Sequence, residues 1–292
     1  MPTDISIIIP LFNKEDFIVQ TLKSILSQDN NDWECIIVDD GSTDNSLQIV
    51  TDFCSTYTGN WKILSVTNGG QTKARNIGIR EATGRYLAFL DADDLWVTDK
   101  LSKQFQYLEG NPDVIAVLSS YAIFGASSGR IRVVRIANFD RMLRNWADMS
   151  GFGGGLESVG MVRRIEGPSG LFFDESLSTS SGLDFMIRCA QLGNVILLKE
   201  IGLLYRLSGG QWHTNIIELS NNAAKIAENY SSYFKSNLHK RHLEYYFWVE
   251  ARKHGHAHLL LMILSDLVHL RASRLQMLLC LFSRNIKALW VG

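Results

Sequence analysis

Short apolar runs alternate with helix-like segments along the first 118 residues of the chain. Four such runs are Ile5–Ile9, Glu34–Val38, Ile63–Val66 and Tyr86–Leu90. Runs this short and this apolar are typical of parallel strands that are covered on both faces. Because the segments between them repeat apolar residues with helical period, the pattern predicts right-handed crossovers and a mostly parallel α/β sheet.

The first helix of this series is expected to begin at Asn13. Asparagine favours the N-cap position, and Asp16 follows three residues later. After them Ile18, Leu22 and Ile25 recur with helical period. We therefore predict a helix that packs back onto the sheet through this apolar face.

Beyond the fourth strand the pattern predicts a second group of elements. They are a helix around Leu101–Leu108, a strand at Val114–Leu118, a hairpin at Tyr121–Val134, a strand at Val159–Arg164, a helix from about Ser181 to Leu192, and strands at Val195–Leu198 and Ile201–Tyr205. From Gln211 onward the pattern is helical throughout. We therefore predict an α/β domain over residues 1–210, with halves 1–124 and 125–210, and a helical C-terminal extension over residues 211–292.

Composition and charge narrow the choice of protein class. The 292 residues carry a formal net charge of −1, which gives no general electrostatic reason to expect a nucleic-acid partner. The four cysteines form no Cys-x-x-Cys pair, so a zinc or redox motif is disfavoured. The N-terminus lacks the basic and apolar segments of a secretory signal, which predicts a cytoplasmic protein.

The C-terminal extension is apolar but interrupted by charged residues. No stretch reaches the roughly 20 apolar residues that a membrane-spanning helix needs. The tail nevertheless combines Arg284, Lys287 and Trp290 with apolar positions. Two interpretations stay open: helices that pack on each other or on the main domain, and an amphipathic tail in peripheral contact with the inner face of the membrane.

Polar residues follow each of the first four predicted strands, at the edge where open α/β sheets bind ligands. These residues are Asn13, Lys14, Glu15, Asp39, Asp40, Ser42, Asn68, Lys73, Arg75, Asp91, Asp93 and Asp94. Three aspartates within four residues repel one another unless a cation neutralises them, so a divalent cation is expected. The alternative is that these aspartates cap the next helix.

Together the loops offer carboxylates for a metal and basic groups for phosphates, as a nucleoside diphosphate site requires. Neither a Walker motif nor Gly-x-Gly-x-x-Gly is present, and Pro10–Asn13 stands where a dinucleotide fold has its glycines. A metal held by Asp93 and bridging two phosphates would stabilise the charge on a departing nucleoside diphosphate, helped by Lys73 and Arg75. A nucleotidyltransferase also uses such a metal, but it usually carries a basic glycine-rich loop after the first strand.

At this point the chain resembles the family 2 glycosyltransferases, which have the GT-A fold. The resemblance rests on four ordered segments, Ile7–Asn13, Ile37–Asp44, Asn68–Gly78 and Leu90–Asp94. It implies an inverting, hexosyltransferase-like enzyme that uses a nucleotide sugar, with a UDP-sugar as the expected donor, and Mg²⁺ or Mn²⁺ held by Asp93. The donor-binding residues that it implies are Pro10, Asn13, Glu15, Asp39 near the base, Asn68, Lys73, Arg75, and Asp91 near the ribose.

The second half is similar to the same family at two places. Leu171–Leu177 resembles its Gly-x-Phe-Asp-Glu segment, and Ser181–Arg188 resembles its Glu-Asp motif, whose aspartate is the general base. By this correspondence Asp184 is the base, and Leu183 stands where the family usually has glutamate. The residue-based alternative for Asp184 is a solvent-facing acid on an amphipathic helix. The resemblance also implies that Arg206 and His213 lie near the diphosphate.

The resemblance further implies an acceptor and a setting. The acceptor would be a hydroxyl of a glycan or of a lipid-linked oligosaccharide, and the product a bacterial surface polysaccharide. Residues 1–124 would then form the nucleotide-sugar-binding half and residues 125–210 the acceptor half. The alternative function, favoured only by Leu183, is a catalytically silent GT-A domain that binds nucleotide or glycan.

Overall fold

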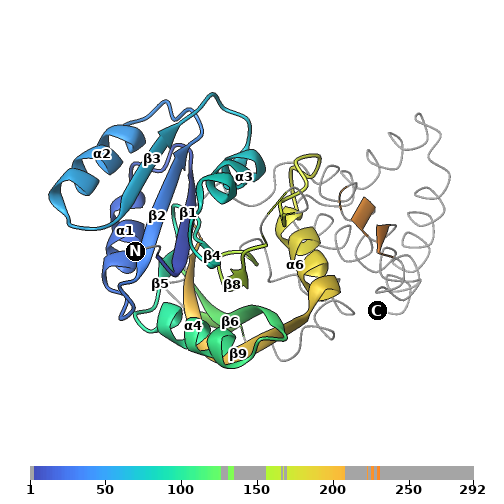
Figure 1. Cartoon of the computed structure of the whole chain (residues 1–292). Helices are drawn as coiled ribbons and strands as arrows, with labels where there is room; N and C mark the ends of the chain where they lie inside the picture. Colours follow the sequence, from blue (N-terminus) through green and yellow to red (C-terminus); the bar gives the residue numbers. More distant parts are fainter. Residues whose placement is uncertain are drawn as a thin grey trace, which may run out of the picture. The chain divides into compact units, whose positions relative to one another are not determined.

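A computed structural model describes residues 3–125, 131–134, 156–165, 167, 170–207, 222, 225–226 and 229–230 (Figure 1). Its strands are β1 (Ile5–Leu11), β2 (Trp33–Asp39), β3 (Trp61–Ser65), β4 (Tyr86–Phe89), β5 (Leu95–Trp96), β6 (Val114–Phe124), β7 (Arg132–Val134), β8 (Gly160–Arg163) and β9 (Asn194–Arg206). Its helices are α1 (Ile18–Leu26), α2 (Ser46–Thr56), α3 (Gln71–Glu81), α4 (Lys100–Gly110) and α6 (Ser181–Leu192). All of these elements belong to one compact unit, made of residues 1–142 and 151–214.

The strands form one mixed sheet in the order β3-β2-β1-β4-β8-β6-β9-β5, with β7 paired to β6. Strands β1, β2, β3 and β4 are mutually parallel, as predicted. In the second half β8 lies between β4 and β6 and is antiparallel to both, while β9 is parallel to β6. The predicted α/β fold class is confirmed, and the antiparallel insertion of β8 makes the whole sheet mixed.

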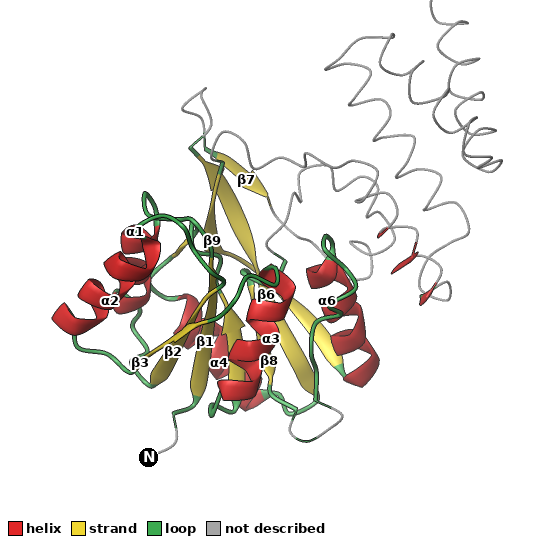
Figure 2. Ribbon diagram, turned by 90° about the horizontal axis from the view of Figure 1, so that it is seen from above, coloured by secondary structure: helices red, strands yellow, loops and turns green. Residues whose placement is uncertain are grey.

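The core lies around the parallel strands. Every residue of β1 and β2 is buried, which explains why these runs are apolar throughout rather than alternating. Helix α3 packs on β1 and β2, α4 on β6 and β8, and α6 on β6 and β9 (Figure 2). Helix α3 approaches β1 closely at Gly78, where an added Cβ would lie 2.5 Å from Cγ2 of Ile8. Glycine is therefore required there to seat α3 on the sheet.

Three elements differ from the prediction. The expected strand 114–118 and the first arm of the hairpin are one continuous strand, β6, and β7 completes the hairpin. The two strands expected between 195 and 205 are likewise one strand, β9, interrupted by register shifts. Strand β5, only two residues long, was not predicted; it pairs with β9.

The predicted cap at Asn13 is wrong. Helix α1 begins at Ile18, with Phe17 as its N-cap, and Asn13 has a positive φ of 51°. Its side-chain oxygen instead accepts hydrogen bonds from the backbone N–H groups of Thr43 and Asp44, at 2.8 and 3.4 Å. Asparagine tolerates this left-handed conformation, and here it joins the loops that follow β1 and β2.

The domain boundary near residue 210 stays a prediction. The helical extension at 211–292, including His213, lies outside the described residues apart from five positions. None of the helices in the described part of the chain is both long and apolar enough to cross a membrane.

Candidate active site

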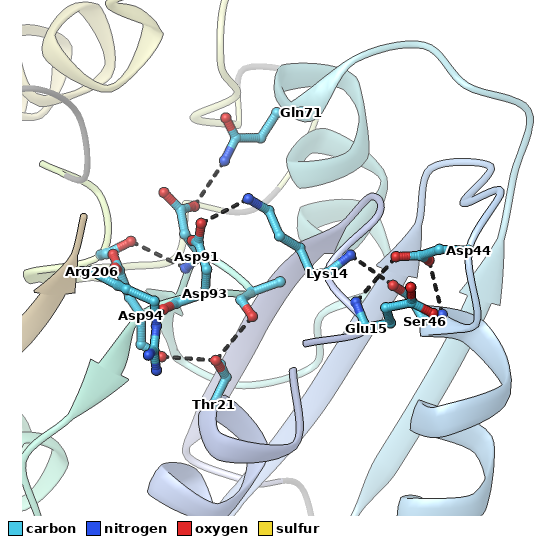
Figure 3. A network of polar contacts seen from close by, with 12 residues as sticks. Lys14, Glu15, Thr21, Asp44, Ser46, Gln71, Asp91, Asp93, Asp94 and Arg206 are labelled. Carbon is cyan, nitrogen blue, oxygen red and sulfur yellow. Dashed lines mark hydrogen bonds and ion pairs between the residues drawn. The ribbon is translucent and has the colours of Figure 1, made fainter. Parts of the chain in front are cut away.

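The loop after β4 carries the acidic cluster and is fixed by its backbone. The N–H of Asp94 donates to the carbonyl oxygen of Asp91 at 3.0 Å, which closes a turn. From α1, the hydroxyl of Thr21 lies 3.0 Å from the carbonyl oxygen of Ala92 and 2.8 Å from that of Asp94 (Figure 3). Helix α1 thus anchors the backbone of the loop through Thr21, and the carboxylates of the loop point in different directions.

Asp93, the predicted metal ligand, forms an ion pair with Lys14 from the loop after β1. The ammonium Nζ lies 2.7 Å from Oδ2 of Asp93 (Figure 3). Burial raises the pKa of the Asp93 carboxyl, Lys14 lowers it, and the nearby Asp91 charge raises it again, so the net shift is upward. Asp93 is therefore a buried carboxylate that needs a cation, and Lys14 provides one.

Asp93 can hold a divalent cation only if a bound ligand supplies further coordinating atoms. Within the described ranges, no cluster of three or more His, Cys, Asp or Glu side chains is arranged to hold a metal. Magnesium is commonly held by one or two carboxylates together with the phosphates of a bound nucleotide. Asp93 and the adjacent Asp91 match that arrangement, so the residues present fit a metal that enters with a diphosphate.

Asp94 binds the backbone of β9 and does not cap a helix. Its Oδ1 accepts the backbone N–H of Arg206 at 2.8 Å, while Oδ2 is buried without a hydrogen-bond partner among the described residues. Burial, with the charges of Asp91 and Asp93, raises its pKa well above the usual range. The N-cap position of the next helix is Asp99, so the alternative in which the 91–94 aspartates cap α4 is wrong.

Arg206 fastens the loop from β9. Its Nε donates to the carbonyl oxygen of Asp93 at 2.8 Å, and its NH2 group donates to Oε1 of Gln20 at 2.7 Å. The guanidinium lies between the rings of Phe17 and Phe124, 5.0 and 4.6 Å from their centroids. The structure therefore joins Arg206 to the acidic loop, next to the position expected for a diphosphate.

Arg75 is the cation at the centre of the site, and it is almost fully buried. Its NH2 atom lies 2.6 Å from Oδ1 of Asp91 and 2.8 Å from Oε1 of Glu157. Burial lowers the Arg75 pKa, but the carboxylates of Glu157 and Asp91 outweigh this effect and raise it. The ring of Phe173 lies beneath the guanidinium, 5.5 Å away. In this arrangement Arg75 orients Asp91, whereas the sequence predicted a direct donor contact.

The loops after β2 and β3 are held together by two buried aspartates. Asp39 accepts hydrogen bonds from the N–H of Ser42 and the hydroxyl of Ser65, both at 3.3 Å. Asp40, which was expected at this edge but given no donor-binding role, accepts the N–H groups of Gly69 and Gly70, each at 2.8 Å. Asp40 therefore ties the loop after β3 to the loop after β2, next to Asp39, the last residue of β2.

Two of the other predicted donor-binding residues make contacts within the loops themselves. Asn68 donates its side-chain amide to the carbonyl oxygen of Asp40 at 2.9 Å. Glu15 accepts the backbone N–H of Asn45 at 3.0 Å and its side-chain amide at 2.8 Å. Asn68 and Glu15 therefore shape the loops at the strand ends. A third predicted residue, Pro10, is buried within strand β1.

Lys73 is exposed on the first turns of α3. A Cβ added at Gly69 would lie 2.5 Å from Cδ of Lys73, so the lysine stem crosses over that glycine. The ammonium group therefore lies beside the 68–70 loop, where the sequence places a phosphate-binding cation.

Asp184, the predicted base, is buried on α6, so the alternative of a solvent-facing acid is wrong. Its Oδ2 accepts two hydrogen bonds from Arg188, at 2.9 Å from Nε and 2.7 Å from NH2. This ion pair joins positions i and i+4 of the same helix. Leu183 beside it is also buried, which gives the leucine a packing role.

Two site residues escaped the sequence interpretation, and both precede β8. Glu157 is buried and pairs with Arg75, as described above. Ser158 accepts the backbone N–H of Asp91 at 3.2 Å through its hydroxyl oxygen. Only the placement of β8 beside β4 brings them to the acidic loop. The one sequence signal was a lone acid at the start of an apolar strand, which is too common to single out.

Comparison with known proteins agrees with this geometry. The model of the family described as Glycosyl transferase family 2 matches residues 6–190. A β-1,3-glucosyltransferase of Escherichia coli, WfgD, whose name gives UDP-Glc and α-D-GlcNAc-diphosphoundecaprenol as substrates, is 32% identical over 146 residues. That match covers 48% of this chain and 55% of WfgD. Across eight curated relatives the match spans between 15% and 55% of the relative's length.

Solved structures share the fold at low sequence identity. TarS of S. aureus with UDP-GlcNAc matches 84% of this chain and 72% of its own, with a TM-score of 0.61 and 20% identity. A mannosyltransferase of Pyrobaculum calidifontis with GDP-Man and Mn²⁺ matches 100% of this chain and 88% of its own, with a TM-score of 0.59 and 18% identity. The predicted GT-A fold is thereby confirmed. Because the family match covers well over half of the chain, the protein belongs to glycosyl transferase family 2.

Proposed function

We propose that the protein transfers a sugar from a nucleoside diphosphate sugar, with a UDP-sugar as the expected donor, to a hydroxyl of a glycan or lipid-linked acceptor, with inversion at the anomeric carbon. The observation that carries this proposal is the acidic loop after β4. Its backbone is fixed by Thr21, and Asp91 is oriented by the buried Arg75. The substrates named for WfgD, and the UDP-GlcNAc bound by TarS, support a UDP-sugar donor.

Each loop in the donor half of the site has a proposed role. Asp93 would hold Mg²⁺ or Mn²⁺, which neutralises charge on the departing diphosphate when it is bound. Asp91, which is held in place by Arg75 and Gln71, would accept a hydrogen bond from the ribose. Asp39, at the end of β2, lies where the nucleotide base is expected. Lys14 and Lys73 provide positive charge on either side of the phosphates.

The acceptor hydroxyl must lose its proton as it attacks. The family resemblance assigns this proton transfer to Asp184. In the structure its carboxylate is bound by Arg188, so the assignment requires that pair to open. Substitution of Asp184 by asparagine, followed by nucleotide release at equal folded fraction, measures what this carboxylate contributes to turnover.

Donor binding is the direct test of the proposal. Thermal unfolding should be followed with UDP-glucose, UDP-N-acetylglucosamine and GDP-mannose, each with Mn²⁺ or with EDTA. A ligand that binds only the folded protein stabilises it by about 2.7 kcal/mol at 100 times its Kd. We expect one donor to raise the melting temperature only when Mn²⁺ is present. If none of the three does so, the proposed function is wrong for these donors.

Asp93→Ala tests the metal assignment in the same assay. The variant should lose the Mn²⁺-dependent stabilisation, because the carboxylate assigned to the metal is gone. Asp52→Ala is the matched control, since Asp52 is an exposed acid on α2 far along the chain from the loop. Donor binding that survives in Asp93→Ala would exclude Asp93 as the metal ligand.

The second candidate function is a silent domain that binds donor without transferring it. Its support was Leu183, and the burial of this leucine in the core weakens that support. The two functions differ in one measurement. Release of free nucleotide from a bound donor indicates an enzyme, whereas donor-induced stabilisation without any release indicates a binding domain.

A further inference from the structure

The basic side chains that contact the acidic loop after β4 differ in how firmly they are held. Arg75 is almost fully buried, and its guanidinium lies between two carboxylates. Arg206 donates hydrogen bonds to a backbone carbonyl of the loop and to a glutamine on α1, and it lies between two aromatic rings. Each of these guanidinium groups therefore has several partners that keep it in place.

Lys14 is held at a single point. Its Nζ lies 2.7 Å from Oδ2 of Asp93, and this is the one contact that its ammonium makes among the described residues (Figure 3). The Lys14 side chain is 24% exposed, whereas that of Arg75 is 2% exposed. A lysine ammonium has three donors on a flexible stem of four carbons. The ammonium can therefore leave Asp93 with the loss of one ion pair.

The backbone of Lys14 is fixed independently of its ammonium. Its N–H donates to the hydroxyl oxygen of Ser46 at 2.7 Å, which joins the loop after β1 to the start of α2. Its carbonyl oxygen accepts the N–H groups of Phe17 and Ile18, both at 3.0 Å, just before and at the start of α1. Movement of the ammonium thus needs only rotation about side-chain bonds, and the loop keeps its shape.

The partner of Lys14 is the carboxylate that we assign to the metal. Oδ2 of Asp93 is already bound to a monovalent cation, the ammonium. A divalent ion on the same carboxylate would lie a few ångströms from that ammonium, and the two positive charges would repel each other. A metal ion that arrives alone must therefore compete with Lys14 for Asp93.

A diphosphate removes this competition. Its oxygens are ligands for a divalent ion and strong acceptors for an ammonium group. When a nucleoside diphosphate binds at the strand ends, Lys14 can move from Asp93 to the phosphates while the metal takes its place on Asp93. The carboxylate then has a cation both before and after the exchange, and the displaced ammonium has a new partner. Metal and diphosphate should therefore bind cooperatively.

Resting on the proposed function, we propose that Lys14 is an exchangeable counter-ion of Asp93. It neutralises this carboxylate until Mg²⁺ or Mn²⁺ enters with a nucleoside diphosphate, and it then binds the diphosphate. The exchange makes tight metal binding depend on the nucleotide. The same side chain thus opposes binding of the metal alone and favours binding of the nucleotide with its metal, and these two effects can be measured separately.

Lys14→Met tests both effects, because methionine removes the charge and keeps an unbranched stem. Binding of Mn²⁺ without nucleotide is followed by the electron paramagnetic resonance signal of the free ion. We expect its Kd to fall by about three- to tenfold, because the competing cation is gone. Binding of UDP, or of GDP if the wild-type protein prefers it, is measured by calorimetry at saturating Mn²⁺. That Kd should rise by about tenfold or more, because a charged hydrogen bond to the diphosphate is lost.

Four further variants separate the exchange from other effects of the substitution. Lys14→Gln is a second neutral variant and should shift both constants in the same directions. Lys14→Arg keeps the positive charge, so it should not bind Mn²⁺ alone more tightly than the wild type. In an Asp93→Ala background Lys14→Met should leave Mn²⁺ binding unchanged, because the carboxylate for which the two cations compete is absent. Lys23→Met, at an exposed lysine on α1, is the matched control and should keep both wild-type constants.

Opposite shifts of the two constants support the exchange, and either shift alone overturns it. A lysine that only binds phosphate would weaken nucleotide binding in Lys14→Met and leave binding of Mn²⁺ alone at the wild-type level. A counter-ion that stays on Asp93 would change Mn²⁺ binding and leave nucleotide binding unchanged. Failure of the wild-type protein to bind either nucleotide with Mn²⁺ is a different result, and it contradicts the proposed function itself. Thermal unfolding in EDTA establishes that each variant is folded.

Discussion

Asp93 and Asp94 are adjacent in sequence and both buried, but their carboxylates have different partners. Asp93 forms an ion pair with Lys14, whereas Asp94 accepts the backbone N–H of Arg206. The sequence could predict that a cation is needed among these acids, because their clustering alone requires it. It could not predict which acid faces the ligand, since that depends on the turn and on β9, more than a hundred residues later.

Asp94→Asn should stabilise the metal-free protein at alkaline pH. An acid whose pKa is raised on folding binds protons more tightly in the folded state, so its ionisation lowers stability as the pH rises through the folded-state pKa. Asparagine removes that ionisation. We expect a gain of about 1–2 kcal/mol at pH 8 and a smaller gain at pH 5, on the scale of a buried polar group without a partner.

Urea unfolding in EDTA at the two pH values measures this difference. Asp52→Asn, at an exposed acid on α2, is the control and should change little at either pH. A gain for Asp94→Asn that is equal at pH 5 and pH 8 would show that ionisation of Asp94 is not its source.

Arg75→Met should be strongly destabilising, because it leaves the buried carboxylate of Glu157 and the partly exposed one of Asp91 without their cation. Removal of one partner from a buried charge network costs about 3–5 kcal/mol. Lys62→Met, which breaks the exposed Lys62–Glu81 pair, should cost less than about 1 kcal/mol. Equal losses in the two variants, measured by urea unfolding at pH 7, would contradict the central role of Arg75.

At the scale of elements, one helix joins the two halves of the site. Thr72, Arg75 and Asn76 lie three and four residues apart and so share one face of α3. Thr72 reaches the carbonyl oxygen of Leu177 and the hydroxyl of Ser181, at 3.2 and 3.3 Å. The same face therefore holds the segment before α6 and orients Asp91.

Asn76→Ala should loosen that segment. The Asn76 side chain donates to the carbonyl oxygen of Phe173 at 2.9 Å and accepts its N–H at 2.8 Å, so both backbone groups would lose their partner. We expect a loss of about 1–3 kcal/mol in urea unfolding. Gln48→Ala, which removes one exposed side-chain contact on α2, is the control and should stay within about 0.5 kcal/mol of wild type. Indistinguishable losses would contradict this role for Asn76.

Helices and strands could be predicted where the apolar residues follow one regular spacing along the whole segment. β1 and β2 are buried at every position, and α6 was placed at its observed bounds because its apolar positions follow a helical repeat. β5 could not be found, since two residues are too few to show a period. The Asn13 cap failed because the same residue type also suits a left-handed turn, and only the contact with Thr43 decides between them.

For the whole molecule, the parallel part of the sheet could be predicted and the insertion of β8 could not. Parallel strands in chain order bring their loops to one edge, so Asp39 and Asp91 were expected together. The position of β8 between β4 and β6 depends on long-range pairing that no local pattern contains. That pairing is what brings Glu157 to Arg75, and it explains why this acid escaped a search by motif.

The last prediction concerns the C-terminal extension, for which the sequence offers a membrane contact. The chain ending at Gly255 retains every site residue described above, all of which precede Leu207, so we expect its Mn²⁺-dependent donor stabilisation to equal that of the full chain. It lacks Arg284, Lys287 and Trp290. Co-sedimentation with vesicles of phosphatidylglycerol and phosphatidylethanolamine should therefore fall at least tenfold, since basic and aromatic residues drive such binding.

Two results would distinguish the roles of the extension. If the shortened chain sediments with these vesicles as well as the full chain does, the tail is not the membrane contact. If it keeps its fold by circular dichroism but loses donor stabilisation, the extension contributes to the donor site. Salt provides the internal control, because an electrostatic contact of the full chain weakens as the Debye length shortens from about 10 Å at 0.1 M to about 3 Å at 1 M. Binding that persists at 1 M salt would assign the contact to the apolar face of the tail instead of its charges.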